Sequence, residues 1–147
     1  ARLNEGMTCI SYSDAVTEVE KEVVRKLFLS VGKIEEIPEK LMNAAICANG
    51  SSPAFVYMFM EALADGAVKY GIPRDLAYRL VGQTVLGSAK MLLETGEHPG
   101  SLKDAVCSPG GTTIAGVAAL EEHGLRNAVL KSVDACYEKA ENMNKKK

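Results

Sequence analysis

Several features that would assign a function directly are absent from this sequence of 147 residues. Neither sign of charge is in excess, because 17 basic side chains are balanced by 19 acidic ones, for a net charge of -2 at pH 7. This balance excludes the strongly basic surface that nucleic-acid binding requires. The single basic run, Lys145–Lys147, is expected to lie in solvent. The longest apolar run, Pro53–Met60, is far too short to cross a bilayer, so we expect no membrane contact.

Motifs for metal, disulfide and nucleotide chemistry are also missing. No two cysteines form a CxxC pair, and their wide spacing predicts reduced thiols in a cytosol-like compartment. The cysteines are Cys9, Cys47, Cys107 and Cys136. His98 and His123 lie in no HExxH or His–Cys pattern, so we expect no metal site. Neither GxGxxG nor GxxxxGK followed by Ser or Thr occurs, so we expect no phosphate-binding loop for a dinucleotide in this chain.

The composition is that of an ordinary globular chain, with 47% hydrophobic and 24% charged residues. Its length is about that of one domain. The first residues, ARLNEGMTCI, do not begin with Met and do not resemble a signal or transit peptide. We therefore expect a soluble, cytoplasmic chain that is part of a longer protein.

The N-terminal quarter is predicted to form a strand, a helix and a second strand. Residues 6–12 are rich in β-forming side chains and predict the first strand. Ser13 or Asp14 can cap a helix that continues to Gly32, because their oxygens accept hydrogen bonds from the first turn. The apolar residues of this helix recur every three or four positions: Val16, Val19, Val23, Leu27 and Val31. Residues 33–37 alternate between polar and apolar side chains, which predicts a short edge strand.

The remainder of the chain is predicted to be helical. The helix that begins at Pro53 and ends at Gly71 is apolar on nearly every face of its first half. A helix that is hydrophobic all round must be buried all round, and a chain of this size has little room for one. We therefore predict that another chain covers part of it, in a dimer. Further helices are predicted over residues 73–95, 102–106 and 113–122 and from Leu125 onward.

A Gly-rich turn at residues 107–112 carries the most specific chemistry. Gly110 and Gly111 have no Cβ, so the backbone of this turn can approach a ligand closely. A helix opens directly after them, and the unpaired N–H groups and dipole of a helix N-terminus favour an anion. The nearby hydroxyls, which can donate to a carboxylate or a phosphate, belong to Ser108, Thr112 and Thr113. An ordinary helix cap explains the same residues, and it equally explains a second Gly–Ser turn at residues 48–55.

The stretch DAVCSPGGTTIAGVAALE, residues 104–121, resembles the signature of the pyrroline-5-carboxylate reductase family. The matching positions are Val106, Cys107, Ser108, Gly110, Gly111, Thr113, Gly116, Val117, Leu120 and Glu121. Residues 39–80 and 83–106 are similar to the long helices of that family's C-terminal domain, and GMTCISY and VGKIEEI to the last strands of its N-terminal sheet. One departure is at Asn49–Ala54, where the family often has Ser-Gly-Ser-Gly-Pro-Ala.

The resemblance implies a fold and an activity. The fold would be mainly α, a helical bundle resembling the 6-phosphogluconate dehydrogenase C-terminal-domain-like fold, in an intertwined dimer, with two short N-terminal β-strands left over from a Rossmann sheet. Residues 1–37 would end the Rossmann-type domain, and residues 38–147 would form the helical dimerisation and substrate-binding domain. The parent protein would be an oxidoreductase of proline biosynthesis that reduces 1-pyrroline-5-carboxylate to L-proline with NAD(P)H.

The resemblance also implies the site residues and partners. The residues that would bind the substrate carboxylate are Ser108, Gly110, Gly111, Thr112 and Thr113. The Thr113 hydroxyl would also lie near the ring nitrogen as the catalytic group. The cofactor, NADPH or NADH, would be bound mainly upstream of Ala1, with Gly50 and Ser51 as further candidates. The partner would be a second copy of the chain, and larger assemblies of dimers occur in the family.

Two other interpretations remain open. The fold could be kept as a non-catalytic helical dimerisation module, or it could belong to a different small-acid dehydrogenase of the same two-domain architecture. An intact anion-binding turn favours the reductase over the module, and the absence of a lysine near a Gly–Gly turn disfavours the other dehydrogenase. Because no cofactor domain is present in these 147 residues, we expect them to fold and dimerise alone but to show no reductase activity.

Overall fold

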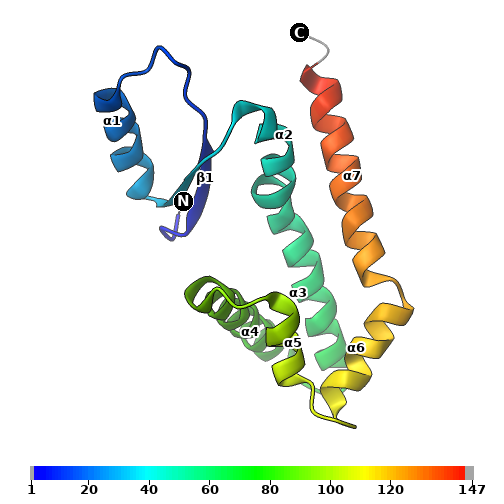
Figure 1. The fold of residues 1–147 in the computed structure, drawn as a ribbon. Helices are drawn as coiled ribbons and strands as arrows, with labels where there is room; N and C mark the ends of the chain where they lie inside the picture. Colours follow the sequence, from blue (N-terminus) through cyan, green and yellow to red (C-terminus); the bar gives the residue numbers. More distant parts are fainter. Residues whose placement is uncertain (1, 145–147) are drawn as a thin grey trace. The chain divides into compact units, whose positions relative to one another are not determined.

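The computed structural model describes residues 2–144, so the basic run Lys145–Lys147 lies outside the described residues. The structure is mainly helical, with two short strands near the N-terminus, as predicted (Figure 1). Contacts divide the chain into two compact units. The first consists of residues 2–52 together with residues 132–144, and the second of residues 53–131.

The first unit begins with a strand–helix–strand element, which confirms the prediction for this part of the chain. Strand β1 (Gly6–Ile10) pairs in parallel with strand β2 (Gly32–Glu36), and helix α1 (Glu18–Leu29) connects them (Figure 1). Gly6 lies opposite Gly32 in the register. A Cβ on Gly32 would overlap the backbone of Gly6, so a glycine is needed where the two strands begin to pair.

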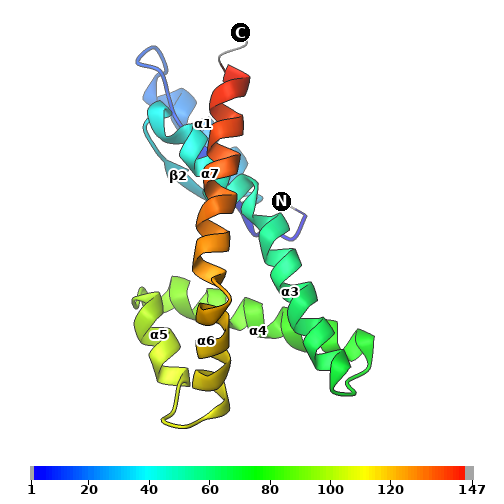
Figure 2. The ribbon, with the colours of Figure 1, turned by 90° about the vertical axis from the view of Figure 1, so that its right-hand side faces the viewer.

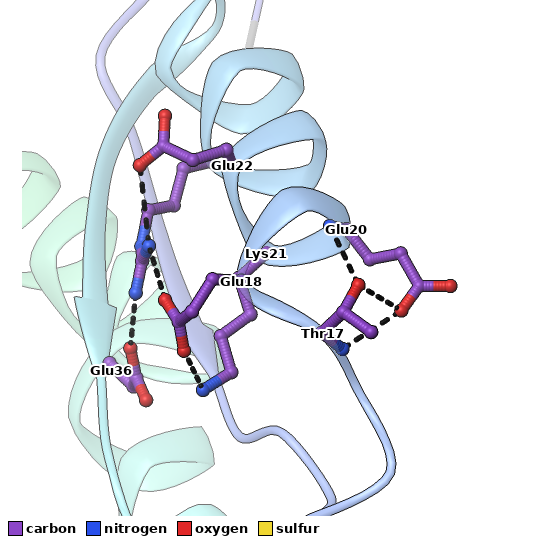
Figure 3. Close-up of polar contacts among 7 residues, drawn as sticks. Thr17, Glu18, Glu20, Lys21, Glu22 and Glu36 are labelled. Carbon is purple, nitrogen blue, oxygen red and sulfur yellow. Dashed lines mark hydrogen bonds and ion pairs between the residues drawn. The ribbon is translucent and has the colours of Figure 1, made fainter.

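Helix α1 begins later than predicted, because Thr17 caps it and not Ser13 or Asp14. The Thr17 N–H donates to Glu20 Oε2 at 2.9 Å, and the Glu20 N–H donates to Thr17 Oγ1 at 3.4 Å (Figure 3). This reciprocal capping box satisfies N–H groups that have no partner within the helix. Thr17 is followed three positions later by a glutamate, whereas neither Ser13 nor Asp14 is followed by Glu or Gln at that spacing.

An ion pair joins α1 to β2, and ring contacts join α1 to Tyr12, which follows β1. Arg25 Nη2 donates to Glu36 Oε2 at 3.1 Å, and Arg25 Nη1 donates to Glu22 Oε1 at 3.4 Å (Figure 3). Lys21 Nζ and the Arg25 guanidinium lie 5.5 and 5.9 Å from the centre of the Tyr12 ring. The hydrogen bond with Glu36 raises the pKa of Arg25. Because the ion pairs are exposed, each contributes little to stability, and their main effect is to fix the orientation of the helix.

Short helical turns complete the first unit. Its further elements are η1 (Glu39–Leu41), α2 (Met42–Ala45), η2 (Ile46–Gly50) and the C-terminal part of α7 (Leu125–Asn144). A hydrogen bond of 2.6 Å from Asn43 Nδ2 to Glu141 Oε1 joins α2 to α7 (Figure 1). The element η2 is a π-helical turn, a feature that is frequent at functional sites and that hydrophobic periodicity does not distinguish from an ordinary helix.

All the regular elements that the structure describes in the second unit are helices. They are α3 (Ser52–Lys69), α4 (Arg74–Thr95), α5 (Pro99–Val106), α6 (Thr112–Glu122) and the N-terminal part of α7. The helical ranges predicted from the sequence are confirmed to within a few residues. Helix α4 ends at Gly96, whose φ of 65° is the left-handed conformation that glycine adopts easily. Arg74 and Asp65 form an ion pair across the α3–α4 connection, which raises the pKa of Arg74.

The chain buries few side chains of its own. Among the described residues, the buried hydrophobic side chains are Cys47, Ala64 and Ala77. Large apolar side chains are exposed instead, and on α3 both Tyr57 and Met58 are 69% exposed. The apolar helix predicted from the sequence therefore has little cover within a single chain. No helix in the described part of the chain is long and apolar enough to cross a membrane.

Candidate anion-binding site

A tight turn connects α5 to α6, and Figure 2 shows these two helices side by side. At the end of α5 the Cys107 N–H donates to the Asp104 carbonyl oxygen at 2.9 Å. The Gly111 N–H then donates to the Ser108 carbonyl oxygen at 3.0 Å. These bonds fix a four-residue turn, Ser108–Gly111, directly before the first residue of α6.

The two glycines of this turn are needed for different reasons. A Cβ on Gly111 would overlap Ser108 Oγ and lie 3.1 Å from the Ser108 carbonyl oxygen, so the Ser108 side chain occupies the space that a larger residue would need. Gly110 has open space around it but a φ of 69°, which side chains other than glycine adopt with strain. The turn therefore depends on close approach at one glycine and on backbone conformation at the other.

The first turn of α6 presents hydrogen-bond donors that the chain does not use itself. The N-cap residue is Gly111, which has no side chain that could accept from the helix. The first N–H groups of a helix have no acceptor within it, and they carry the positive end of its dipole. No hydrogen bond in the described structure involves the hydroxyls of Ser108, Thr112 or Thr113, and all three residues are exposed.

This geometry distinguishes between the two explanations that the sequence left open for the turn, an ordinary helix cap and an anion-binding site. If its hydroxyls served only as a helix cap, one of them would accept a hydrogen bond from the first turn of α6, and none does within the described residues. Backbone and hydroxyl donors instead stay available on one exposed surface. Such a surface can bind a small anion, either a carboxylate or a phosphate.

The nearest cation on α5, Lys103, is already paired. Its hydrogen bond with Asp104 raises the pKa of Lys103, so the ammonium stays charged at neutral pH while a carboxylate balances it. On α6, Glu121 pairs with Arg126 Nε at 2.6 Å. An anion at this turn would therefore be held mainly through directed donors and the helix dipole, and only weakly through net charge.

A separate apolar hollow lies among α5, α6 and the start of α7, with a volume of about 560 Å³. Its lining residues are Lys103, Val117, Leu120, Glu121, Leu125, Arg126, Val129 and Leu130. No residue of the Ser108–Gly111 turn lines it. Because its lining is largely aliphatic and open to solvent, this hollow suits the side chains of another polypeptide better than a small polar substrate.

The second candidate from the sequence, around Gly50 and Ser51, offers less to an anion. A π-helical turn stands where a Gly–Ser turn was predicted, and the Ser51 N–H already donates to the Ile46 carbonyl oxygen at 2.8 Å. The Ser52 hydroxyl donates to the Ala48 carbonyl oxygen at 2.5 Å. A role of Gly50 and Ser51 in cofactor binding stays a prediction.

Two polar contacts near these turns have no counterpart among the sequence predictions. His98 Nδ1 accepts from the Gly100 N–H at 3.0 Å and caps α5, which begins at Pro99 and so earlier than the predicted residue 102. Asn49 Nδ2 donates to the Met7 carbonyl oxygen at 3.2 Å, across a separation of 42 residues that no local pattern indicates. Within the described residues, no group of three or more His, Cys, Asp or Glu side chains could hold a metal ion.

Fold and site together define a class of protein. Apolar helices with few buried side chains of their own need another polypeptide to cover them, and the α5–α6 turn can hold a small anion. The chain is thus a helical domain with exposed apolar helices and a turn whose hydrogen-bond donors face solvent. It belongs to the pyrroline-5-carboxylate reductase dimerisation family, which matches residues 39–143.

Relatives of known sequence agree with this family. The chain is 50% identical over 145 residues to the pyrroline-5-carboxylate reductase of Escherichia coli strain K12, covering 99% of this chain and 54% of the relative. It is 46% identical over 146 residues to the Synechocystis enzyme of the same name, covering 99% of this chain and 55% of that relative. The chain therefore spans about half the length of the curated relatives it matches.

Solved structures show the same fold. The similarity to the 1-pyrroline-5-carboxylate reductase of Streptococcus pyogenes has a TM-score of 0.91 at 40% identity, covering 96% of this chain and 54% of that one. The similarity to the Plasmodium falciparum pyrroline carboxylate reductase with NADP bound has a TM-score of 0.87 at 38% identity, covering 96% and 57%. These similarities confirm the predicted family and its helical fold.

Proposed function

We propose that the whole protein reduces 1-pyrroline-5-carboxylate to L-proline with NADPH or NADH, as a step of proline biosynthesis. The observation that carries the proposal is the α5–α6 turn, whose donors are unused by the described chain, in a member of this reductase family. The substrate bears a carboxylate, which is the kind of anion that a helix N-terminus binds. This chain would supply the substrate site and the dimer interface.

The turn would act by positioning the substrate. The residues that we assign to its carboxylate are Ser108, Gly110, Gly111, Thr112 and Thr113. Backbone N–H groups and hydroxyls can hold both carboxylate oxygens, which fixes the orientation of the ring, and such positioning supplies a large part of the rate enhancement. We assign the Thr113 hydroxyl also to the ring nitrogen, as the catalytic group. A substrate that arrives protonated on this nitrogen needs no strong acid from the protein.

We propose that the residues of this chain contribute only a small part of the dinucleotide site. Around Gly50, the Ser51 N–H and the Ser52 hydroxyl are already bonded, which leaves the Ser51 hydroxyl as the available donor. We therefore place the cofactor mainly in the part of the whole protein that precedes this chain, with Gly50 and Ser51 at its edge. The NADP bound to the Plasmodium falciparum structure supports this choice of cofactor.

We also propose a domain boundary. Residues 1–37 would be the end of a Rossmann-type domain, and residues 38–147 the helical dimerisation and substrate-binding domain. The β1–α1–β2 element supports this division, since it is a βαβ unit and a two-stranded parallel sheet is not stable by itself. The relatives support it too, because they are nearly twice as long as this chain.

The proposed partner is a second copy of the chain, with larger assemblies built from such dimers. The exposed apolar side chains of α3 support it, since Val56 and Leu63 are 41% and 42% exposed in addition to Tyr57 and Met58. We place the protein in the cytoplasm, an assignment that rests on the free thiols of its cysteines.

A non-catalytic dimerisation module is the second candidate function. The exposed helices alone favour it, because they need only a partner and no substrate. The unused donors of the turn favour the reductase, because a module that only dimerises has no use for them.

The experiment that tests the proposal measures NADPH and NADH consumption with 1-pyrroline-5-carboxylate, using the whole protein with its upstream residues. Turnover that yields proline is expected. A folded dimer that turns over with neither cofactor would leave the dimerisation module as the function.

The isolated chain of 147 residues is expected to dimerise without reducing the substrate, because we place the cofactor mainly outside it. The same assay, run on this chain at matched concentration, checks the prediction. Clear NADPH-dependent turnover by the isolated chain would contradict both this expectation and the placement of the cofactor site.

A further inference from the structure

The side chain of Asn49 joins the π-helical turn η2 to strand β1. Its Nδ2 donates to the Met7 carbonyl oxygen at 3.2 Å and to Cys9 Sγ at 3.4 Å. Both acceptors belong to β1, which lies 42 and 40 residues earlier in the chain at these two contacts. One amide group therefore fixes the position of two segments that are far apart in the sequence.

The carbonyl group that Asn49 binds lies on the free edge of β1. Gly6 and Ile10 form backbone hydrogen bonds of 3.0 and 2.9 Å with the residues that flank β2. Alternate residues of a strand bond to the same neighbouring strand, so the backbone groups of Met7, between these two, point away from β2. An open strand edge presents unpaired carbonyl and N–H groups. The Asn49 amide satisfies one of them, as a neighbouring strand would.

The turn that carries Asn49 is closed by a hydrogen bond of its own. The Ser51 N–H donates to the Ile46 carbonyl oxygen at 2.8 Å, across the whole of η2. Cys47, within the same turn, is buried. Because this bond closes the turn, a contact that holds the Asn49 side chain also holds Gly50 and Ser51, which follow it directly.

The Ser51 side chain lines an open hollow. This hollow lies between η2 and α7 within the first unit and has a volume of about 520 Å³. The N–H of Ser51 is used inside the turn, so its hydroxyl is the group that stays available to a ligand. The place of this hydroxyl depends on where η2 is held, and a shift of the turn moves it.

We propose that Asn49 is a positioning residue for the cofactor site: its amide ties η2 to β1 and thereby sets the place of the Ser51 hydroxyl. The role of Ser51 at the edge of the cofactor rests on the proposed function, whereas the tie between η2 and β1 does not. Strand β1 precedes the proposed domain boundary after residue 37, and η2 follows it. Asn49 therefore also joins the two sides of that boundary.

Two substitutions test the amide donor itself. Aspartate has nearly the shape of asparagine, but its carboxylate only accepts hydrogen bonds and would face the Met7 carbonyl oxygen. Alanine removes the donor without adding a charge. Asn142→Asp is the control for the added charge, because Asn142 is exposed on α7 in the same unit. An effect shared by Asn49→Asp and Asn49→Ala and absent from Asn142→Asp comes from the lost donor.

The first measurement is the affinity of the whole protein for NADPH and NADH, from titrations that follow the fluorescence of the reduced cofactor. Asn49→Asp and Asn49→Ala should each raise the Kd about five- to tenfold, the effect of losing one hydrogen bond. KM for 1-pyrroline-5-carboxylate should stay at the wild-type value, because the α5–α6 turn belongs to the second unit.

Two results of these titrations overturn the proposal. One is a wild-type Kd in Asn49→Ala. The other is an equal rise of the cofactor Kd and of KM for 1-pyrroline-5-carboxylate, which is a general loss of structure and no positioning of one site. If Asn49→Asp does not fold, Asn49→Ala decides the question.

A measurement that needs no cofactor separates this inference from the proposed function. Hydrogen exchange of the whole protein, followed by mass spectrometry, reports local opening of the backbone at residues 46–51. Exchange there should be faster in Asn49→Asp and Asn49→Ala than in the wild type and unchanged in Asn142→Asp. Faster exchange in a protein that binds neither cofactor would refute the proposed function and leave the tie standing. Exchange at the wild-type rate in both Asn49 variants refutes the tie, whether or not a cofactor binds.

Discussion

At the scale of single residues, the α5–α6 turn depends on two glycines and carries hydroxyls that form no hydrogen bond within the described residues. Gly111 leaves the space that the Ser108 side chain fills, and Gly110 permits a left-handed backbone. The hydroxyls on either side of these glycines have no partner in the part of the chain that the structure describes. A turn so arranged supports the proposal that it binds the carboxylate of a substrate.

The first prediction concerns Gly111→Ala in the whole protein. Its Cβ would displace the Ser108 side chain, so KM for 1-pyrroline-5-carboxylate should rise about tenfold or more, which corresponds to about 1.4 kcal/mol of lost binding. Steady-state kinetics at constant pH measures it. Gly116→Ala is the matched control, because a Cβ there meets nothing within 4 Å and alanine favours a helix. Equal KM values for the two variants would contradict the placement of the site.

The second prediction concerns Thr113→Ala. If the Thr113 hydroxyl holds both the carboxylate and the ring nitrogen, kcat/KM should fall about a hundredfold, the lower end of what one such group contributes. Thr113→Ser keeps the hydroxyl and should recover most of the activity. Wild-type kcat and KM in Thr113→Ala would show that the catalytic group lies elsewhere.

The turn that carries the proposed site could be predicted from the sequence, but the contacts around it could not. Gly110, Gly111 and the threonines after them form a local pattern, and the structure places them together in one turn. The contact of Asn49 with Met7 depends on how distant segments meet, which no short pattern encodes. The capping by His98 is local, but histidine is an uncommon N-cap residue and gives no standard signal.

At the scale of elements, both ends of α4 were predicted from proline and glycine, whereas the starts of α1 and α5, which side chains cap, were not. Gly96 and Pro73 define the ends of α4 within one residue of the prediction. Helix α1 begins at Glu18, after the capping box of Thr17, although Ser13 and Asp14 are equally good single caps by residue type. The two reciprocal hydrogen bonds of the capping box stabilise the start of the helix more than the one hydrogen bond of a single cap does.

The third prediction concerns this capping box. Thr17→Ala should lower the free energy of unfolding by about 1 kcal/mol at pH 7, whereas Ser13→Ala should leave it unchanged. Urea unfolding followed by circular dichroism measures both. Equal effects of the two substitutions would contradict the assignment of Thr17, rather than Ser13, as the N-cap of α1.

The effect of Thr17→Ala should also depend on pH. The Thr17 N–H and hydroxyl bond the Glu20 carboxylate and lower the pKa of Glu20 below its ordinary value of 4.5. A carboxylate whose pKa is lowered by folding stabilises the folded state above its ordinary pKa and loses this contribution as the pH falls through the folded value. The difference between wild type and Thr17→Ala should therefore shrink below about pH 4.5. A difference that stays constant down to pH 3 would exclude the Glu20 carboxylate from the cap.

At the scale of the whole molecule, apolar surface is the dominant feature. The family match, residues 39–143, contains α3, whose Tyr57 and Met58 are largely exposed in the single chain. Sequence periodicity already indicated that this helix is apolar on all sides, because the pattern lies within one segment. The surface proposed to cover it belongs to a second copy of the chain, so its structure could not follow from this sequence pattern.

The fourth prediction concerns Tyr57→Glu. If a second copy covers α3, the new carboxylate is buried without a partner, which costs about 3 kcal/mol or more and weakens dimerisation at least a hundredfold. Sedimentation velocity measures the change. Val19→Glu is the control, because Val19 is 76% exposed on α1, outside the family match. Dimers of equal strength for the two variants would show that α3 is not the interface.

The scarcity of buried side chains among the described residues makes the stability of the folded protein depend on its concentration. When most apolar area is covered only by association, the folded state is favoured by mass action, and each tenfold dilution removes about 1.4 kcal/mol of its stability per dimer. Unfolding midpoints then shift with protein concentration, and refolding slows as an encounter between two chains becomes rate-limiting. Such a protein folds stably only where its own concentration is high enough for its chains to associate.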